Sequence, residues 1–398
     1  MTPSSLPVIR LKPKANVRAI RFGAPWVYDN EVVTDRRTRA IEPGTICLLE
    51  DHDRAALALV AVNPKSRIFA RVMDRDLKAS IDRAWLVEKL QAALALRETF
   101  YPSPFYRLVH AEGDGLPGVV IDRFGDIAVV QPNAAWSDRM LPALVDALQE
   151  VTGVAHVLKN AAGRARGLEG LDGESGVLAG QVPDAPVAVS MNGATYLADL
   201  VEGQKTGLFY DQRPNHAFAA QAARGARVLD VFSHVGGFGL AALAQGAEHA
   251  LAVDGSAAAL ALANDGAARM GHGARYATRQ GDAFDVLTAL AGEGQSFDVV
   301  ICDPPAFAPS KQALEAGLRA YERVARLAAT LVVPGGILGL CSCSHAADLA
   351  RFRAASVRGI GRAGRRGALL HTGSAGPDHP QHPHLAESAY LKALFFRL

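Results

Sequence analysis

The feature that most constrains the fold of this chain is a glycine-rich turn that follows a short apolar run. Residues 227–232 are mostly apolar, Gly236 and Gly237 lie in the turn, and the Ala/Leu-rich stretch 240–246 follows. This order predicts a buried parallel strand, a glycine loop and a helix. A second apolar run then ends at Asp254, which completes the pattern of a βαβ unit.

The same unit has the features of a site for a nucleoside cofactor. An acid at the end of its second strand can accept hydrogen bonds from both hydroxyls of a ribose. Glycines let a cofactor approach the backbone closely, because they carry no Cβ. The glycine spacing is not G-x-G-x-x-G, and the motif G-x-x-x-x-G-K-[ST] does not occur in the chain. A cofactor without a bound pyrophosphate fits better, and S-adenosylmethionine is the candidate.

Size and charge limit the classes of protein to consider. A length of 398 residues predicts two or three domains, because single cores stop growing before that size. Hydrophobic residues make up 49% of the chain and charged residues 21%, which excludes wholesale disorder. The formal net charge is only +2, so any binding of nucleic acid must come from local basic patches.

Two further features indicate the compartment. The N-terminus lacks the apolar core of a signal peptide, and no run approaches the ~20 apolar residues that cross a bilayer. The four cysteines, at positions 47, 302, 341 and 343, are too few and too unevenly placed for a disulfide framework. We therefore expect a soluble cytoplasmic protein with reduced thiols and no contact with membranes.

The chain divides into three parts by pattern. Residues 1–75 contain short strands separated by Gly and Pro, which predicts a small β-rich domain. Residues 76–186 combine an amphipathic helix at 82–100 with a hairpin at 119–131, which predicts a mixed α+β domain. Residues 187–398 alternate strands with helices, which predicts an α/β domain built on a parallel sheet.

Basic residues gather in two places where RNA could bind. In the first domain they interleave with Phe22, Trp26 and Tyr28, a composition expected of a surface that contacts RNA. A Gly-rich loop in the second domain adds two arginines that could meet phosphates. The alternative for both groups is an ordinary solvated face. The candidate RNA-binding residues are Lys12, Lys14, Arg18, Arg21, Arg164 and Arg166.

Acids recur where the predicted strands of the α/β domain end. Ligands of an open α/β sheet bind outside the carboxyl ends of its strands. A single acid there could be only a helix cap, but four in succession indicate a site. We expect Asp254 to contact the ribose, Asp282 to contact the adenine amino group, and Asp303 to face the reacting base. The four acids are Asp230, Asp254, Asp282 and Asp303.

The last of these acids begins the tripeptide Asp303-Pro-Pro305. The tripeptide is stiff, because each proline fixes its own φ and restrains the residue before it. A rigid carboxylate and carbonyl at the edge of a sheet can grip the exocyclic amine of a nucleobase. The same tripeptide occurs in N-methyltransferases that act on exocyclic amines, so it indicates a nucleobase pocket but not which atom is methylated.

Cys341 and Cys343 bear on that choice of atom. Carbon 5 of a pyrimidine becomes nucleophilic only after a thiolate has added to carbon 6, so its methylation needs a cysteine. Residues two apart on a strand point to the same face, and Cys343 is nearer the carboxyl end. Cys343 is therefore the candidate nucleophile, and the alternative is that both cysteines are small core residues. Zinc fits poorly, because the cysteines lack C-x₂₋₄-C spacing and the histidines of the irregular, Arg/Gly/His-rich stretch that follows have no regular intervals.

Several motifs together carry a resemblance that covers nearly the whole chain. These motifs are Leu11-Lys-Pro, Pro25-Trp-Val27, Gly113-Asp-Gly-Leu-Pro-Gly118, Ile121-Asp-Arg123, Gly203-Gln-Lys-Thr-Gly207, Asp211-Gln-Arg213, Asp230-Val-Phe-Ser, Gly236-Gly-Phe, Asp303-Pro-Pro305, Ser342-Cys-Ser344, Asp378-His-Pro380 and Tyr390-Leu-Lys392. With them the chain resembles the RlmI (YccW) type of S-adenosylmethionine-dependent 23S rRNA cytosine-C5 methyltransferases. The resemblance implies an N-terminal PUA domain, a central connecting domain and a Rossmann-like class I methyltransferase domain.

The resemblance also implies roles for single residues. Cys343 matches the nucleophile of the family, and Asp303 is the second catalytic candidate because it faces the base. The residues expected to contact the cofactor, from the resemblance and the strand ends together, are Gln204, Lys205, Asp230, Phe232, Ser233, Gly236, Gly237, Asp254, Gly281, Asp282 and Asp303. The expected partner is RNA, most directly 23S rRNA, without a metal ion, and a homodimer is left open.

The chain departs from the family pattern near the expected target side. Ala24 precedes Pro-Trp where His is usual, Ala306 follows Asp-Pro-Pro in place of Lys, and His345 follows Ser-Cys-Ser in place of Gly. Residues 161–164 replace a charged Arg/Asp segment. Two alternatives therefore stay open: an RNA-binding protein whose cofactor domain is inactive, and an exocyclic-amine methyltransferase whose cysteines are structural.

Overall fold

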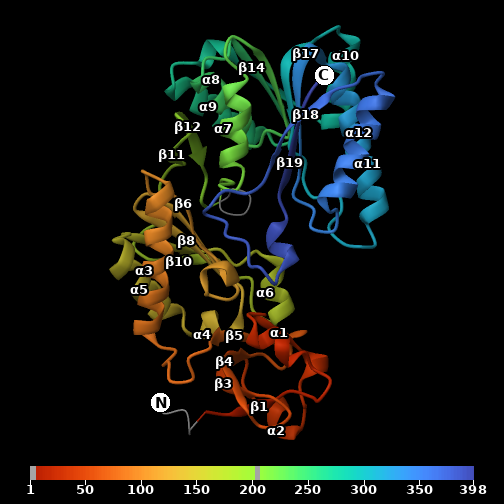
Figure 1. The fold of residues 1–398 in the computed structure, drawn as a ribbon. Coiled ribbons are helices and arrows are strands. Elements are labelled where there is room, and N and C mark those ends of the chain that lie inside the picture. The colour runs from red at the N-terminus through yellow and green to blue at the C-terminus, as the bar shows by residue number, and fades with distance from the viewer. Residues whose placement is uncertain (1–5, 202–206) are drawn as a thin grey trace. The chain divides into compact units, whose positions relative to one another are not determined.

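The computed structural model describes residues 6–201 and 207–398, and the chain forms two compact units. The first unit consists of the chain up to Asp184 together with the segment Pro377–Ser388. The second consists of Ala185–Gly376 and Ala389–Leu398. Each unit is thus built from two separate stretches of sequence, which Figure 1 traces by colour.

The first unit begins with a five-stranded sheet in the order β1-β3-β4-β5-β2. β1 pairs parallel to β3, and the other neighbours are antiparallel. Apolar side chains such as Val27, Cys47 and Val60 are completely buried in its core. The elements are β1 (Val8–Arg10), α1 (Val17–Arg21), β2 (Trp26–Tyr28), α2 (Arg36–Arg39), β3 (Thr45–Glu50), β4 (Ala56–Val62) and β5 (Ile68–Asp74).

A second five-stranded sheet of this unit has the order β10-β9-β8-β7-β6. The helix predicted at 82–100 is α3, and Asp82 caps it by accepting a hydrogen bond from the N–H of Trp85. The predicted hairpin is β7-β8. The elements are α3 (Arg83–Phe100), β6 (Phe105–His110), β7 (Val119–Phe124), β8 (Ile127–Pro132), α4 (Ala135–Arg139), α5 (Leu141–Thr152), β9 (His156–Lys159), α6 (Arg164–Glu169) and β10 (Gly176–Ala179).

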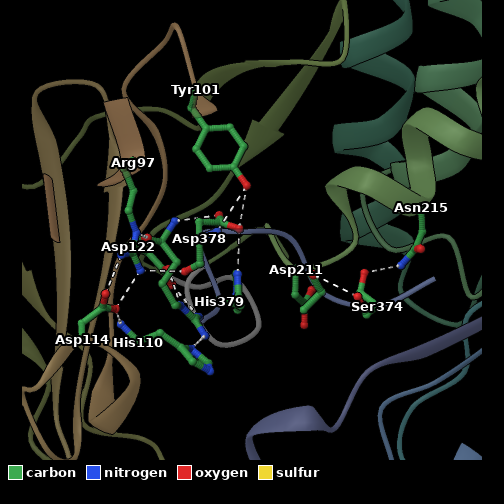
Figure 2. Close-up of polar contacts among 12 residues, drawn as sticks. Arg97, Tyr101, His110, Asp114, Asp122, Asp211, Asn215, Ser374, Asp378 and His379 are labelled. Carbon is green, nitrogen blue, oxygen red and sulfur yellow. Dashed lines mark hydrogen bonds and ion pairs between the residues drawn. The ribbon is translucent and has the colours of Figure 1, made fainter. Parts of the chain in front are cut away.

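The segment Pro377–Ser388 joins the first unit through buried charged groups (Figure 2). Arg97 of α3 donates to both carboxylate oxygens of Asp114, at 2.5 and 2.7 Å, and to the carbonyl oxygen of Asp378 at 2.9 Å. The Asp378 carboxylate accepts in turn from the backbone N–H of Arg107 at 3.1 Å. Arg97 and Asp378 are completely buried, so both charges depend on these partners.

The second unit is built on a seven-stranded sheet in the order β15-β14-β13-β16-β17-β19-β18. Its first five strands are parallel, and β19 runs antiparallel to β17 and β18. Figure 1 shows helices on both faces of this sheet, as the predicted Rossmann-like α/β fold requires. The strands are β13 (Arg227–Val231), β14 (His249–Asp254), β15 (Tyr276–Gln280), β16 (Phe297–Cys302), β17 (Val332–Ser342), β18 (Ala368–Gly373) and β19 (Lys392–Arg397).

Helices and a separate hairpin complete the second unit. The hairpin consists of β11 (Val187–Met191) and β12 (Ala194–Ala198), and the sequence pattern did not predict it. The helices are α7 (Arg213–Gln221), α8 (Gly237–Ala244), α9 (Ala257–Arg269), α10 (Ala283–Gly292), α11 (Leu314–Thr330) and α12 (Leu349–Arg362). In the part of the chain that the structure describes, no helix is long and apolar enough to span a bilayer.

Candidate active site

The carboxyl ends of the parallel strands bring the predicted site to one edge of the sheet. Val231 at the end of β13 pairs with Val253 of β14 and with Cys302 of β16. Backbone hydrogen bonds continue this register, because Ser233 N donates to Val253 O at 3.0 Å and Asp303 N donates to Val231 O at 3.1 Å. The strand order reverses at β13, and an open α/β sheet binds its ligands at such a point.

The glycine loop between β13 and α8 has an unusual backbone. Phe232 and His234 adopt positive φ angles of 62° and 50°, which residues with side chains rarely do. Gly236, the residue before α8, has φ 84°. Asp254 holds the loop, because its two carboxylate oxygens accept from the N–H groups of His234 and Ser256, each at 2.8 Å. Strained backbone of this kind is concentrated at functional sites.

Close packing explains the glycines of this loop, and one hydroxyl in it that is unsatisfied among the described residues fits a bound nucleoside cofactor. A Cβ on Gly236 would lie 2.5 Å from the Tyr276 hydroxyl, and a Cβ on Gly237 would lie 2.7 Å from Nε2 of His216. Only glycine therefore fits at both positions. The hydroxyl of Ser233 is buried and has no hydrogen-bond partner among the described residues. Such a hydroxyl usually bonds a ligand or water, so the loop fits S-adenosylmethionine.

Asp230 has a different role from the expected one. Its side chain is completely buried, and its Oδ2 accepts from the N–H groups of Phe238 at 3.1 Å and Gly239 at 2.8 Å. Burial raises the pKa of Asp230 to about 7, and the two backbone donors act against this shift. The expectation that Asp230 contacts the cofactor is corrected accordingly, because a carboxyl without exposed surface fixes the start of α8 behind the glycine loop.

Gly281 and Asp282 follow the end of β15. Gly281 N donates to the carbonyl oxygen of Asp254 at 3.0 Å, which ties the ends of two strands together. Asp282 is exposed and caps α10, since its Oδ1 accepts from the N–H groups of Phe284 at 2.9 Å and Asp285 at 3.2 Å. The capping role is therefore present, and a contact of Asp282 with adenine stays a prediction.

The segment Ser342-Cys343-Ser344 at the end of β17 alternates in burial. Ser342 and Ser344 are completely buried, and their hydroxyls lie 2.9 and 2.7 Å from the Tyr321 hydroxyl of α11. Ser344 Oγ also accepts from the N–H of Ala308 at 3.0 Å, in the loop after Asp-Pro-Pro. The serines thus tie the turn that contains Cys343 to α11 and to the loop after Asp-Pro-Pro. Cys343, which lies between them, is partly exposed.

The four cysteines differ in their surroundings. Cys343 Sγ lies 4.0 Å from the carbonyl oxygen of Pro304 at the Asp-Pro-Pro segment. Cys47, Cys302 and Cys341 are buried. Burial raises the pKa of the Cys341 thiol well above its usual value, so this sulfur is a poor nucleophile. Among the described residues, no group of three His, Cys, Asp or Glu side chains could hold a metal ion.

Some predicted residues cannot be placed, and two that were not predicted reach the site. Gln204 and Lys205 lie outside the described residues, so their contacts with the cofactor stay predictions. Tyr321 bonds the serines, and Lys392 Nζ donates to the carbonyl oxygen of Ser344 at 2.6 Å. Tyr321 belongs to an ordinary amphipathic helix, and Lys392 ends the motif Tyr390-Leu-Lys392, to which the sequence analysis assigned no role.

The candidate RNA-binding residues of the first domain lie at its surface. Lys14 and Arg18 are exposed, and the Arg18 guanidinium lies 5.2 Å from the centre of the Phe22 ring. Lys12 donates to a backbone carbonyl, and Arg21 pairs with a carboxylate of the same domain. Contact of these four residues with RNA stays a prediction.

Arg164 and Arg166 lie in helix α6 and not in the expected loop. Arg164 is exposed. Arg166 is 1% exposed, and its guanidinium donates to the carboxylates of Asp138 and Asp172 and to the carbonyl oxygen of Pro132. The expectation that Arg166 binds RNA is corrected for this reason, since its donors are used in the interior.

The strand order, the glycine loop and the acid at the end of β14 define a Rossmann-like S-adenosylmethionine-dependent methyltransferase. A family model described as S-adenosylmethionine-dependent methyltransferase matches residues 150–397, and a PUA-like domain model matches residues 9–75. The chain belongs to this methyltransferase family, and within it to the group of proteins named ribosomal RNA large subunit methyltransferase I.

Relatives match along the whole chain. The ribosomal RNA large subunit methyltransferase of Deinococcus radiodurans is 35% identical over 99% of this chain and 98% of its own. The ribosomal RNA large subunit methyltransferase I of Shewanella denitrificans is 33% identical over 98% of this chain and 99% of its own. Among solved structures, a chain from Streptococcus mutans proposed to be a SAM-dependent methyltransferase has a TM-score of 0.82, 19% identity and coverage of 99% and 100%. A second, complexed with SAH, has the same TM-score and identity, and both likenesses show the fold alone.

Proposed function

We propose that this chain methylates carbon 5 of a cytidine in 23S rRNA, with Cys343 as the nucleophile. The names of its relatives support ribosomal RNA as the substrate. The position of Cys343 is the observation that favours carbon 5 over an exocyclic amine. Cys343 is partly exposed and lies beside Asp-Pro-Pro, whereas Cys47, Cys302 and Cys341 are buried. The proposal places the reaction in the cytoplasm, where bacteria, the sources of these relatives, assemble their ribosomes.

The proposed reaction begins with a bond between Sγ of the Cys343 thiolate and carbon 6 of cytosine. This addition makes carbon 5 a nucleophile, and the cofactor, when bound, supplies a methyl group on a sulfonium that leaves as a neutral thioether. A base then removes the proton from carbon 5, the electron pair restores the 5,6 double bond, and the sulfur–carbon bond breaks. Cys343 is released as the thiolate, so the enzyme is unchanged.

The neighbours of Cys343 support an orientation for the base. Asp303 follows β16 directly, and the Pro304 carbonyl oxygen lies 4.0 Å from the cysteine sulfur. A carboxylate and a carbonyl are acceptors, and cytosine presents an exocyclic amine as a donor. In the proposal these two acceptors hold the amine while carbon 6 faces Cys343, which brings the reacting atoms together.

A trapping experiment tests the role of Cys343. The purified protein is incubated with S-adenosylmethionine and rRNA in which cytosine carries fluorine at carbon 5. Fluorine cannot leave as a proton, so the wild-type protein should stay covalently attached to the RNA. Cys343→Ala should neither trap nor methylate, while Cys341→Ala, which changes a buried cysteine, should still trap. Wild-type methylation by Cys343→Ala would overturn the carbon 5 mechanism in favour of an exocyclic amine.

We also propose that residues 1–75 form a domain that contributes RNA affinity, ahead of a connecting domain at 76–186 and a catalytic domain at 187–398. Lys14 and Arg18 are exposed there, and Arg18 lies beside the aromatic ring of Phe22. Exposed basic and aromatic side chains of this kind are typical of surfaces that bind RNA. Replacing both by Glu should weaken RNA binding and flatten its salt dependence, since phosphate contacts release counterions. Lys78→Glu, an exposed lysine beyond this domain, is the control. Equal RNA affinity in all variants would make the basic residues an ordinary solvated face.

A further inference from the structure

Lys392 places an ammonium group in the interior next to the candidate nucleophile. It is the first residue of β19 and pairs with Ser342 of β17, the residue before Cys343. Only 7% of Lys392 is exposed. Its Nζ donates to the carbonyl oxygens of Ser344 at 2.6 Å and Ala347 at 2.8 Å. The lysine therefore holds the turn that follows Cys343.

A buried ammonium is unfavourable unless its charge is compensated. Two carbonyl oxygens satisfy hydrogen bonds of Lys392 but carry no net charge. The group also interacts electrostatically with Cys343 and Asp348: burial lowers the pKa of Lys392 to about 8, and these two neighbours act against that shift. Lys392 is thus mostly protonated at neutral pH, and a negative sulfur nearby would stabilise it. By reciprocity, the ammonium stabilises the thiolate.

Four other described groups near the cysteine, Asp303, Asp348, Tyr321 and Cys341, do not supply a positive charge. Asp303 follows the neighbouring strand, and Asp348 caps α12. Both are carboxyl groups, which disfavour a thiolate when ionised. The Tyr321 hydroxyl is engaged by the two serines, and burial raises its pKa. Burial also keeps the Cys341 thiol neutral. Compared with these four described groups, Lys392 is the one that carries a positive charge.

We propose that Lys392 is a positioning residue that keeps Cys343 as a thiolate and fixes the turn that presents it. This inference rests on the proposed function, because a thiolate is needed for addition to carbon 6. In this proposal the lysine acts on neither the base nor the methyl group directly. Its contribution passes through the sulfur of Cys343 and through the carbonyl oxygens of Ser344 and Ala347.

Alkylation of the native protein tests the proposal without RNA or cofactor. Iodoacetamide reacts with thiolates by displacing iodide, and the other three cysteines are buried, so Cys343 should be the site of modification. Peptide mass mapping confirms the site, and the rate is followed from pH 5 to pH 10. The wild-type rate should be half-maximal below pH 8.5, the approximate value for a free cysteine.

Three variants separate charge from structure. Lys392→Gln keeps a donor without the charge, and its half-maximal pH should rise by roughly one unit or more, which lowers the rate at pH 7 about tenfold. Lys392→Arg keeps the charge and should stay near wild type. Lys311→Gln removes an exposed lysine of the same unit and should also stay near wild type.

An unchanged half-maximal pH in Lys392→Gln would overturn the proposal and leave Lys392 a structural residue. Should that variant fail to fold, a wild-type value at or above pH 8.5 is equally decisive against it. The result is independent of the trapping experiment. Normal methylation by Cys343→Ala would remove the carbon 5 mechanism, while the alkylation profile would still report whether Lys392 acts on the thiol.

Discussion

Asp254 combines two tasks in one carboxylate. It holds the glycine loop through the N–H groups of His234 and Ser256, and the sequence predicts that it also binds the ribose of the cofactor. Each carboxylate oxygen has a second lone pair, so the two tasks are compatible. Asp254 is also only partly buried, which leaves it accessible to a ligand.

Replacement of Asp254 by Ala should weaken S-adenosylmethionine binding by about 1–3 kcal/mol, because ligand hydroxyls lose their acceptor. Isothermal calorimetry measures this loss directly. Asp298→Ala is a matched control, since Asp298 also accepts a backbone N–H, that of Arg227, but at the opposite end of β13. An affinity that is equal in wild type and Asp254→Ala would refute the ribose assignment.

Asp230 predicts a dependence of stability on pH. Its folded pKa of about 7 lies above the ordinary value, so the unfolded chain loses this proton first as the pH rises. The native state is therefore progressively destabilised between about pH 4 and pH 7, by up to roughly 4 kcal/mol. Asp230→Asn does not titrate, so its melting temperature relative to wild type should rise from pH 5 to pH 8. A difference that stays constant over this range would contradict the shifted pKa.

The sequence predicts well which residues lie at the carboxyl ends of the strands, whereas the roles of these residues stay predictions. Asp254 and Cys343 are found because each follows an apolar run. It does not reveal whether a side chain points into a crevice or into the core, which is why Asp230 was misassigned. It also cannot bring Lys392 next to Cys343, because the pairing of β17 with β19 joins residues about fifty positions apart.

At the scale of elements, the start of α8 depends on Gly236. Gly236→Ala should reduce S-adenosylmethionine affinity at least tenfold and lower the melting temperature, because the new Cβ meets the Tyr276 hydroxyl and the φ of 84° is strained. Gly225→Ala is the matched control. Its φ is 69°, but a Cβ there meets nothing within 4 Å, so it should lose only about 1–2 kcal/mol of stability. Equal cofactor affinity in both variants would contradict the close packing of the loop.

Helices and strands with a regular apolar spacing or a capping residue could be predicted from the sequence. Those that contain several glycines, or whose residues are mostly exposed, could not. Helix α3 and the hairpin β7-β8 lie within one residue of the predicted bounds, because their apolar residues recur at a regular spacing and a capping residue or turn marks their ends. Helix α12 lies in the stretch taken as irregular, since its glycines look like breakers. The structure explains Gly359, where a Cβ would collide with the Glu322 carbonyl oxygen of α11. β18 is an edge strand with mostly exposed residues, so it lacks the alternation that reveals a strand.

At the scale of the whole molecule, Asp378 links a late segment of the chain to the first unit. Asp378→Ala removes the acceptor of the Arg107 N–H and of the Tyr101 hydroxyl, which should cost about 2–4 kcal/mol. Hydrogen exchange should then accelerate in α3 and β6 but not in β13 or β16. Glu387→Ala, an exposed change in the same segment, should leave exchange unaltered. Unaltered exchange in Asp378→Ala as well would mean that the buried network does not stabilise the unit.

The discontinuous first unit also sets an order of events during synthesis. A ribosome releases the chain from its N-terminus, so residues up to Asp184 emerge roughly 190 residues before Asp378. At ordinary translation speeds this interval lasts about 10–40 s. Throughout it Arg97 has Asp114 but lacks the Asp378 carbonyl, and Arg107 N–H lacks its carboxylate. The first unit, although most of it is made first, is therefore completed only when Ser388 emerges, shortly before the last stretch of the second unit, Ala389–Leu398.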